Sequence, residues 1–141
     1  MIRVALADDH HQVREIWHFI LSSNAAFEVV AKCSNGREAV EAAQLHYPDI
    51  FLMDINMQPM NGIDATEIIL QTLPGVKVIG MSMHAEMVYV KRMLQAGAQG
   101  YVTKNSPYEE VFRAILEVNA GQQYLCQEIE NRMPGLAMAM R

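Results

Sequence analysis

The chain has 141 residues, of which 51% are hydrophobic and 19% charged, and this is the composition of one folded domain rather than of a disordered segment. Its formal net charge of −5, with no run of Lys or Arg longer than two, argues against direct nucleic-acid binding by this segment. No apolar stretch reaches the roughly 18 residues of a membrane span, and the first residues have a strand-like pattern rather than that of a signal peptide, so we expect a cytoplasmic protein with no membrane partner.

Short apolar runs alternate along the chain with longer segments of helical periodicity. The first run ends in two aspartates, and the segment after it places apolar residues at the i, i+3, i+4 and i+7 spacing of a helix. Further along, Pro48, Pro74 and Gly97 stand at the ends of successive helical segments. The predicted strands are 2–7, 27–31, 50–53, 76–81 and 99–102, and the predicted helices are 12–23, 37–46, 63–73, 85–96 and 107–121.

Five strands that alternate with five helices predict an α/β fold. Right-handed crossovers would build a doubly wound parallel sheet that is covered by helices on both faces. Residues 1–122 hold all ten elements and form the predicted domain. Residues 123–141 are a C-terminal extension, in which 123–133 could form another helical turn or two. The pattern leaves open whether 123–141 is a native tail or a truncated linker toward an output domain.

Polar side chains follow four of the predicted strands at their carboxyl ends. Open parallel sheets carry their sites at this edge, so we expect three carboxylates, a hydroxyl group and an amine to converge there. The residues at the four strand ends are Asp8 and Asp9, Asp54, Ser82, and Thr103 with Lys104.

This combination of groups suits phosphoryl transfer. Three clustered carboxylates repel one another, so a bare cluster would raise the pKa of at least one of them. Mg²⁺ (or Mn²⁺) would remove the repulsion, because it prefers carboxylate oxygens and completes its shell with water. Asp54 would then be the in-line nucleophile and would form an acyl phosphate. Lys104 would supply a positive charge, and Ser82 a hydrogen bond, to the phosphoryl oxygens.

The same residues carry a family resemblance. The runs LADDH (6–10), MDINM (53–57) and YVTK (101–104), together with Ser82, resemble response-regulator receiver domains of two-component systems over about residues 1–122. The segments VALADDHHQVRE, MLQAGAQGYVTKNS and GQQYL look like the NarL/FixJ (LuxR-type) subfamily. The resemblance implies a flavodoxin-like, CheY-like (βα)5 fold, with a five-stranded parallel sheet in the order 2-1-3-4-5.

The resemblance also implies a role for each site residue. Asp54 matches the phosphoacceptor, and Asp8 and Asp9 match the acidic pair that holds Mg²⁺ together with it. The backbone carbonyl two residues beyond the acceptor, here that of Asn56, is a further metal ligand in the family. Three more positions match residues that bind the phosphoryl group or respond to it: Ser82 as the hydroxyl switch residue, Tyr101 as the coupled aromatic and Lys104 as the invariant lysine. Met83 and His84, which follow Ser82, are candidate modulators of dephosphorylation.

A receiver of this kind is a signalling phosphoacceptor and not an enzyme in the metabolic sense. The resemblance implies that it takes a phosphoryl group from the phosphohistidine of a sensor histidine kinase. Ser82 would then move toward the phosphoryl group and Tyr101 would turn inward, and homodimerisation would follow. Regulators of this subfamily usually carry a C-terminal LuxR-like DNA-binding domain. That domain is not in this segment. Either the segment is the receiver portion of a longer regulator, which would control transcription through an output domain outside it, or it is a single-domain regulator.

Alternative interpretations remain at the level of sequence. An Asp-nucleophile phosphatase of the haloacid dehalogenase type needs a second acid two residues after the nucleophile, where this chain has Asn56. A degenerate receiver that serves only as an interaction module usually loses the acidic pair or the lysine, and this chain keeps both. His10 and His11 beside two aspartates raise the alternative of a transition-metal site, but we expect them to be surface residues that open the first helix.

Two further local features are the loop after Asp54 and the pair of cysteines. The loop after Asp54 has Gln58 where receivers commonly have proline, with Pro59 one residue later, although the loop keeps its length to Gly62. The two cysteines, Cys33 and Cys126, lack the spacing of a zinc site and are expected to behave as small buried hydrophobic residues.

Overall fold

The strands are the most deeply buried part of the chain. In the computed structural model, which describes residues 1–83 and 86–134, every residue of β3 (Ile50–Asp54) is buried, and so are the last four residues of β1 (Ile2–Ala7). β4 (Lys77–Ser82) and β5 (Gly100–Thr103) are buried almost as continuously, whereas β2 (Phe27–Cys33) has exposed positions. Unbroken buried runs are typical of parallel strands that are covered on both faces.

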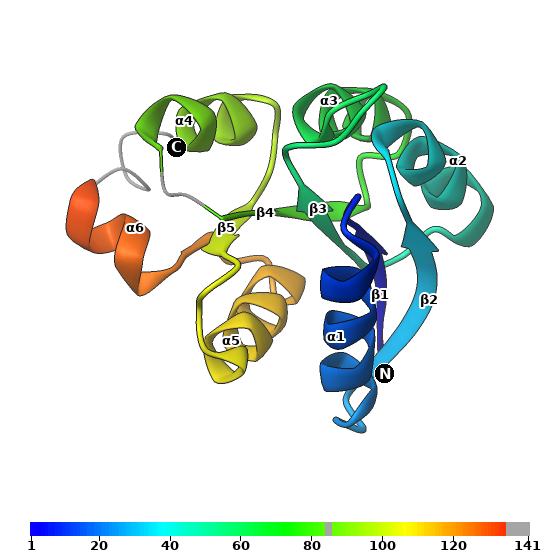
Figure 1. Ribbon diagram of the computed structural model, residues 1–141, viewed down its shortest axis with the longest axis horizontal. Helices are drawn as coiled ribbons and strands as arrows, with labels where there is room; N and C mark the ends of the chain where they lie inside the picture. Colours follow the sequence, from blue (N-terminus) through cyan, green and yellow to red (C-terminus); the bar gives the residue numbers. More distant parts are fainter. Residues whose placement is uncertain (84–85, 135–141) are drawn as a thin grey trace.

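Six parallel strands form one sheet in the order β2-β1-β3-β4-β5-β6. Helices α1 (His11–Ser22) and α5 (Tyr108–Asn119) cover one face, whereas α2 (Gly36–His46), α3 (Gly62–Thr72) and α4 (Met87–Gln95) cover the other (Figure 1). The predicted α/β class and the strand order 2-1-3-4-5 are confirmed. The order reverses between β1 and β3, and open α/β sheets carry their sites at such a point, beyond the carboxyl ends of the strands.

The start of α3 is fixed relative to the end of β3. The Asn61 side chain caps the helix by accepting the backbone N–H of Asp64 at 2.8 Å. Gly62, the first residue of the helix, donates its N–H to the carbonyl of Ile55 at 3.2 Å. A Cβ on Gly62 would overlap the carbonyl oxygen of Asp54, so this position needs glycine. The loop after Asp54 therefore turns back closely over the end of β3.

Residues 123–134 continue the sheet at its far edge. β6 (Tyr124–Leu125) pairs with β5, and α6 (Gln127–Arg132) lies beyond it (Figure 1). Four apolar side chains of this segment are buried in the core: Leu125, Cys126, Ile129 and Met133. The helix expected within 123–133 is present. The sixth strand is an addition to the predicted five, because two residues are too few to show a strand pattern in the sequence.

The limits of the ten predicted elements differ from the observed ones by at most two residues in the described ranges. Both cysteines are free and buried, as predicted. Within residues 1–83 and 86–134, no helix is both long enough and apolar enough to cross a membrane.

Replacing Ile129 with Ala should destabilise the whole domain, because this side chain of α6 is fully buried against the sheet. We expect the free energy of unfolding to fall by about 2–5 kcal/mol, the usual loss for a large-to-small change in a core. Urea denaturation followed by circular dichroism measures it. Leu116→Ala is the matched control, since Leu116 is 49% exposed. An equal, small effect of both substitutions would show that α6 does not fold with the sheet.

Candidate functional site

Three carboxylates lie at the carboxyl ends of β1 and β3. Asp8 and Asp54 are 5% and 2% exposed, whereas the Asp9 side chain is 39% exposed. One carboxylate oxygen from each aspartate and one ring nitrogen of His10 all lie within 4.8 Å of one another. The fold therefore brings together the three aspartates that the strand ends predicted, and it adds His10 to them.

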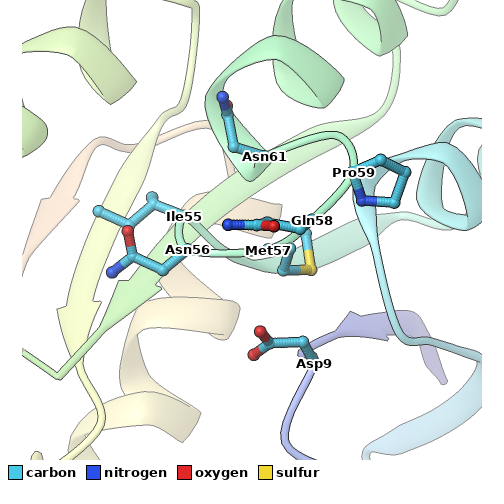
Figure 2. A pocket seen from close by; sticks show the side chains of 7 residues that line it. All are labelled: Asp9, Ile55, Asn56, Met57, Gln58, Pro59 and Asn61. Atoms are coloured by element: carbon cyan, nitrogen blue, oxygen red, sulfur yellow. The ribbon is translucent and has the colours of Figure 1, made fainter.

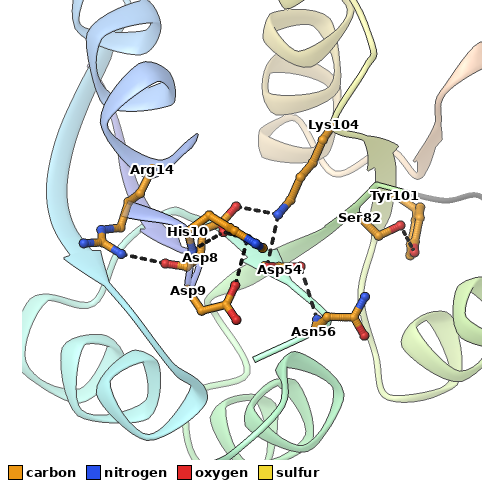
Figure 3. Close-up of polar contacts among 9 residues, drawn as sticks. All are labelled: Asp8, Asp9, His10, Arg14, Asp54, Asn56, Ser82, Tyr101 and Lys104. Atoms are coloured by element: carbon orange, nitrogen blue, oxygen red, sulfur yellow. Dashed lines mark hydrogen bonds and ion pairs between the residues drawn. The ribbon is translucent and has the colours of Figure 1, made fainter. Parts of the chain in front are cut away.

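The ammonium group of Lys104 lies between two of these carboxylates (Figure 3). Its Nζ is 2.7 Å from Asp8 Oδ2 and 3.1 Å from Asp54 Oδ2, and the Lys104 side chain is only 5% exposed. Lys104 directly follows β5, and its backbone N–H donates to the carbonyl of Ser82 at 2.7 Å, at the end of β4. From there the side chain extends over the end of β4 to reach the ends of β3 and β1.

Burial and charge change the ionisation of this group of residues. Burial raises the pKa of Asp54 to about 6; the charge of Lys104 opposes this rise and the charge of Asp8 adds to it. Burial alone would lower the pKa of Lys104, but its hydrogen bond to Asp8 and the two carboxylate charges raise that pKa above its ordinary value. Lys104 is therefore charged at neutral pH, whereas ionised Asp54 carries an energetic penalty that a bound cation would relieve.

The turn after β1 is held by its own side chains. The N–H of His10 donates to Asp8 Oδ1 at 2.9 Å, and the His10 Nδ1 atom lies 3.0 Å from Asp9 Oδ1. The guanidinium group of Arg14 donates to the carbonyl of Asp8 at 2.7 Å and contacts the Nδ1 atom of His11 at 3.1 Å. The sequence holds no signal for the role of Arg14, because one arginine on a helix does not indicate a bond to a carbonyl group. Of the two histidines, His10 is the one placed in the carboxylate cluster.

Ser82 and Tyr101 form a second polar contact near this site. The Ser82 Oγ and Tyr101 hydroxyl oxygens are 2.7 Å apart, and both side chains are buried (Figure 3). Burial raises the pKa of Tyr101 to about 12, so the hydroxyl group keeps its proton at neutral pH. Tyr101 thus already has the inward position that we expected it to take only after phosphorylation.

An open hollow of about 670 Å³ lies beside the carboxylates, between Asp9 and the loop after β3 (Figure 2). The backbone N–H of Asn56 donates to Asp54 Oδ1 at 3.2 Å, and this holds the loop against the carboxylate. Gln58 and Pro59, where the loop departs from the family pattern, line the hollow and are joined by a cis peptide bond. The loop thus forms one wall of an opening next to the acidic cluster.

The other predicted site residues lie at the margins or outside the described chain. Met83 is 56% exposed and borders a second hollow, which Trp17 also lines. His84 lies outside the described residues. Thr103, the second polar residue at the end of β5, contributes to α6 packing, since its hydroxyl group donates to Glu128 at 3.1 Å.

Comparison with known proteins gives the family. A family model described as the response regulator receiver domain matches residues 4–116. The chain belongs to this family. The receiver is 36% identical over 132 residues to the transcriptional regulatory protein DegU of Brevibacillus brevis, and 36% identical over 133 residues to the response regulator UvrY of Escherichia coli (strain K12). Each match covers 94% of this chain but only 56% or 61% of the relative, so the receiver spans less than two thirds of their length.

Solved structures agree with this assignment. A LuxR-family two-component response regulator from Aurantimonas sp. SI85-9A1 superposes with a TM-score of 0.87 at 32% identity, covering 92% of both chains. The signal receiver domain of the putative response regulator NarL from Mycobacterium tuberculosis has a TM-score of 0.81 at 31% identity, over 86% of this chain and 98% of that one. The predicted resemblance to the NarL/FixJ (LuxR-type) subfamily is confirmed.

Replacing Asp54 with Asn should stabilise the metal-free receiver, and more so at pH 7.5 than at pH 4. The folded chain binds the Asp54 proton more tightly than the unfolded chain, so this residue's contribution to stability falls as the pH rises from about 4, the pKa in the unfolded chain, through about 6. Asn does not titrate. Urea denaturation with a chelator present should show the gain in free energy of unfolding growing by about 1–3 kcal/mol between the two pH values. A gain that is equal at both pH values would contradict the raised pKa.

Proposed function

We propose that this receiver accepts a phosphoryl group on Asp54 from the phosphohistidine of a sensor histidine kinase. The observation that carries the proposal is the Lys104 ammonium group, which lies 2.7 Å from Asp8 and 3.1 Å from Asp54 in a buried site. Asp54 supplies a nucleophilic oxygen, Lys104 supplies a fixed positive charge for the phosphoryl oxygens, and the adjoining hollow supplies access.

We propose Mg²⁺ (or Mn²⁺) as the cofactor, with Asp8, Asp9, Asp54 and the backbone carbonyl of Asn56 as its ligands. Carboxylate oxygens from all three aspartates lie within 4.8 Å of one another, and hard oxygen donors of this kind suit either ion. Both oxygens of Asp8 already have partners, in Lys104 and in the His10 N–H, but a carboxylate oxygen can accept more than one contact. When bound, the ion supplies positive charge that offsets the repulsion among the carboxylates and the charge on the transferring group.

The transfer breaks one bond to phosphorus and forms another. An Asp54 oxygen forms a bond to phosphorus as the bond from phosphorus to the kinase imidazole breaks. The electron pair of the broken bond returns to the imidazole, which leaves as a neutral base with the proton on its other nitrogen. Lys104 keeps its contact with Asp8 and exchanges its contact with Asp54 for one with a phosphoryl oxygen. The Ser82 hydroxyl group donates a hydrogen bond to a second phosphoryl oxygen.

The site favours an acceptor that holds the group over a phosphatase that turns it over. A phosphatase of the haloacid dehalogenase type uses an acid two residues beyond its nucleophile. Here that residue is Asn56, and its backbone N–H is bonded to Asp54 at 3.2 Å. We therefore propose that the phosphoryl group remains on Asp54 as a signal.

We further propose that the phosphorylated receiver forms a homodimer and regulates transcription through a LuxR-type DNA-binding domain outside this chain. Support comes from the lengths and names of its relatives: the chain covers 56% of DegU, which is described as a transcriptional regulatory protein, and it superposes on a LuxR-family regulator. The net charge of −5 agrees with a receiver that leaves contact with DNA to another segment.

Incubation with acetyl phosphate and Mg²⁺ should add the mass of one phosphoryl group to the receiver. The addition should be lost in Asp54→Asn, because the amide is not a nucleophile, and lost in excess chelator, because the carboxylate charges are then uncompensated. Intact-mass spectrometry measures both. Asp64→Asn is the matched control, since Asp64 is an exposed carboxylate at the start of α3 and should leave the addition unchanged.

Two results would contradict the proposed function. Either the wild-type receiver gains no mass under any condition, or it gains the same mass when Asp54 is Asn. The first result would leave an interaction module on a receiver fold. Continued release of inorganic phosphate from simple phosphate esters, without a stable addition, would instead indicate a phosphatase.

A further inference from the structure

Tyr101 is held from both sides by the sheet. It pairs with Gly80 of β4 on one side and with Leu125 of β6 on the other. Its carbonyl group also accepts the N–H of Cys126 at 3.0 Å, just beyond β6. Because the backbone is fixed on both sides, a conformational change at Tyr101 is a rotation of its side chain.

Gly80 makes room for the inward ring of Tyr101. Gly80 and Ser82 are two residues apart on β4, so they face the same side of the sheet. A Cβ on Gly80 would lie 2.9 Å from Cδ2 and 3.2 Å from Cε2 of Tyr101, and 2.9 Å from Cγ of Met93 in α4. The ring thus packs directly against the glycine, and its hydroxyl group reaches Ser82 at 2.7 Å. A larger residue at position 80 would displace the ring, the Met93 side chain or both.

The segment 124–133 is attached to the other side of β5 by polar contacts. Glu110 of α5 holds its first part, because one carboxylate oxygen accepts the Tyr124 hydroxyl at 2.9 Å and the backbone N–H of Gln127 at 2.7 Å. Thr103 of β5 holds its second part through the 3.1 Å bond to Glu128. These contacts fix the segment along the edge that Tyr101 borders.

The same segment fills the space beside Tyr101 with apolar side chains. Cys126 and Ile129 are fully buried, and α6 packs against β5. Figure 1 shows α6 on the side of β5 that faces away from β4. Tyr101 and Thr103 are two residues apart on β5 and face the same side of the sheet, the side on which Thr103 is bonded to α6. We therefore expect a Tyr101 side chain that turns away from Ser82 to meet this segment.

We propose that Gly80 and the segment 124–133 together hold Tyr101 inward in the unphosphorylated receiver, so that its aromatic switch is preset. Gly80 is then a positioning residue and α6 is a lock on the switch. The regulatory meaning rests on the proposed function. If phosphorylation requires the inward position, a receiver that already holds it does not need to shift its population before it reacts. A larger residue at position 80, or the loss of the contacts that hold 124–133, frees the ring. Either change lowers the fraction of the receiver that is ready to be phosphorylated.

The position of Tyr101 can be followed by ¹⁹F NMR on the full chain labelled with 3-fluorotyrosine, where Tyr101→Phe identifies its resonance. In the unphosphorylated wild type, this resonance should be single and protected from a soluble paramagnetic agent. Gly80→Ala should shift and broaden it, because the new Cβ meets the ring. Gly75→Ala is the matched control, since a Cβ there meets nothing within 4 Å.

A second variant tests the lock without changing the ring's own contacts. Glu110→Ala removes the two bonds that hold Tyr124 and Gln127, and it should expose the Tyr101 resonance to the paramagnetic agent. Glu109→Ala, an exposed neighbour on α5, is its control and should not do so. Both test variants should also slow phosphorylation by acetyl phosphate about three- to tenfold, in proportion to the lost competent fraction.

The outcomes separate this inference from the proposed function. An unchanged Tyr101 resonance in both Gly80→Ala and Glu110→Ala overturns the inference, whatever the phosphorylation rates are. Glu110→Ala alone decides the matter if Gly80→Ala does not fold. A resonance that moves as expected in a chain that is never phosphorylated supports the hold on Tyr101 and overturns the proposed function instead.

Discussion

The ammonium group of Lys104 lies within hydrogen-bond distance of two buried carboxylates, and the rest of the site depends on this contact. Asp8 directly follows β1 and Asp54 ends the neighbouring β3, so the fold forces two like charges together where little solvent can screen them. Without Lys104, the pair would be left as uncompensated buried charge, a loss that typically costs about 3–5 kcal/mol. One positive charge offsets two carboxylates only in part, and the partly exposed Asp9 adds a third. The site is therefore suited to receive a further cation beside Asp9.

The arrangement of the sheet explains how four distant parts of the sequence meet here. All strands are parallel, so every carboxyl end lies at one edge, and the order reverses between β1 and β3, where the aspartates stand. β5 then connects this site with the far edge of the sheet. Lys104 directly follows this strand and reaches across to Asp54, whereas Tyr101, three residues earlier, borders β6 and α6. β5 therefore links the acidic cluster with the C-terminal segment 124–133.

The convergence of the three aspartates could be predicted from the sequence. Asp8 and Asp54 each stand directly after an apolar run that is typical of a buried strand, and Asp9 follows Asp8. The alternation of strands with helices then predicted the α/β class and a parallel sheet, whereas the strand order came from the family resemblance. The position of Lys104 between Asp8 and Asp54 could not be predicted, since a strand end fixes where a side chain starts and not which oxygen it reaches. The same limit applies to the bond from Arg14 to the Asp8 carbonyl.

Two further features had only weak signals. A glycine inside a strand pattern indicates a close approach, but the sequence does not say that a tyrosine ring approaches Gly80. The two-residue strand β6 is too short to show an alternating pattern in the sequence. The helical pattern of the neighbouring residues did indicate the helical turns of α6. Both features become visible only when β4, β5 and β6 lie side by side.

The most direct test of the account is a crystal structure of the receiver with Mg²⁺ and beryllium fluoride, which mimics a phosphoryl group on a carboxylate. We predict an ion bound by Asp8, Asp9, Asp54 and the carbonyl of Asn56, and a beryllium fluoride group on the other oxygen of Asp54. Lys104 should keep its contact with Asp8 and move from the Asp54 oxygen, now at 3.1 Å, to a fluorine. An ion bound elsewhere, or a Lys104 that still bridges an unmodified Asp54, would contradict the account.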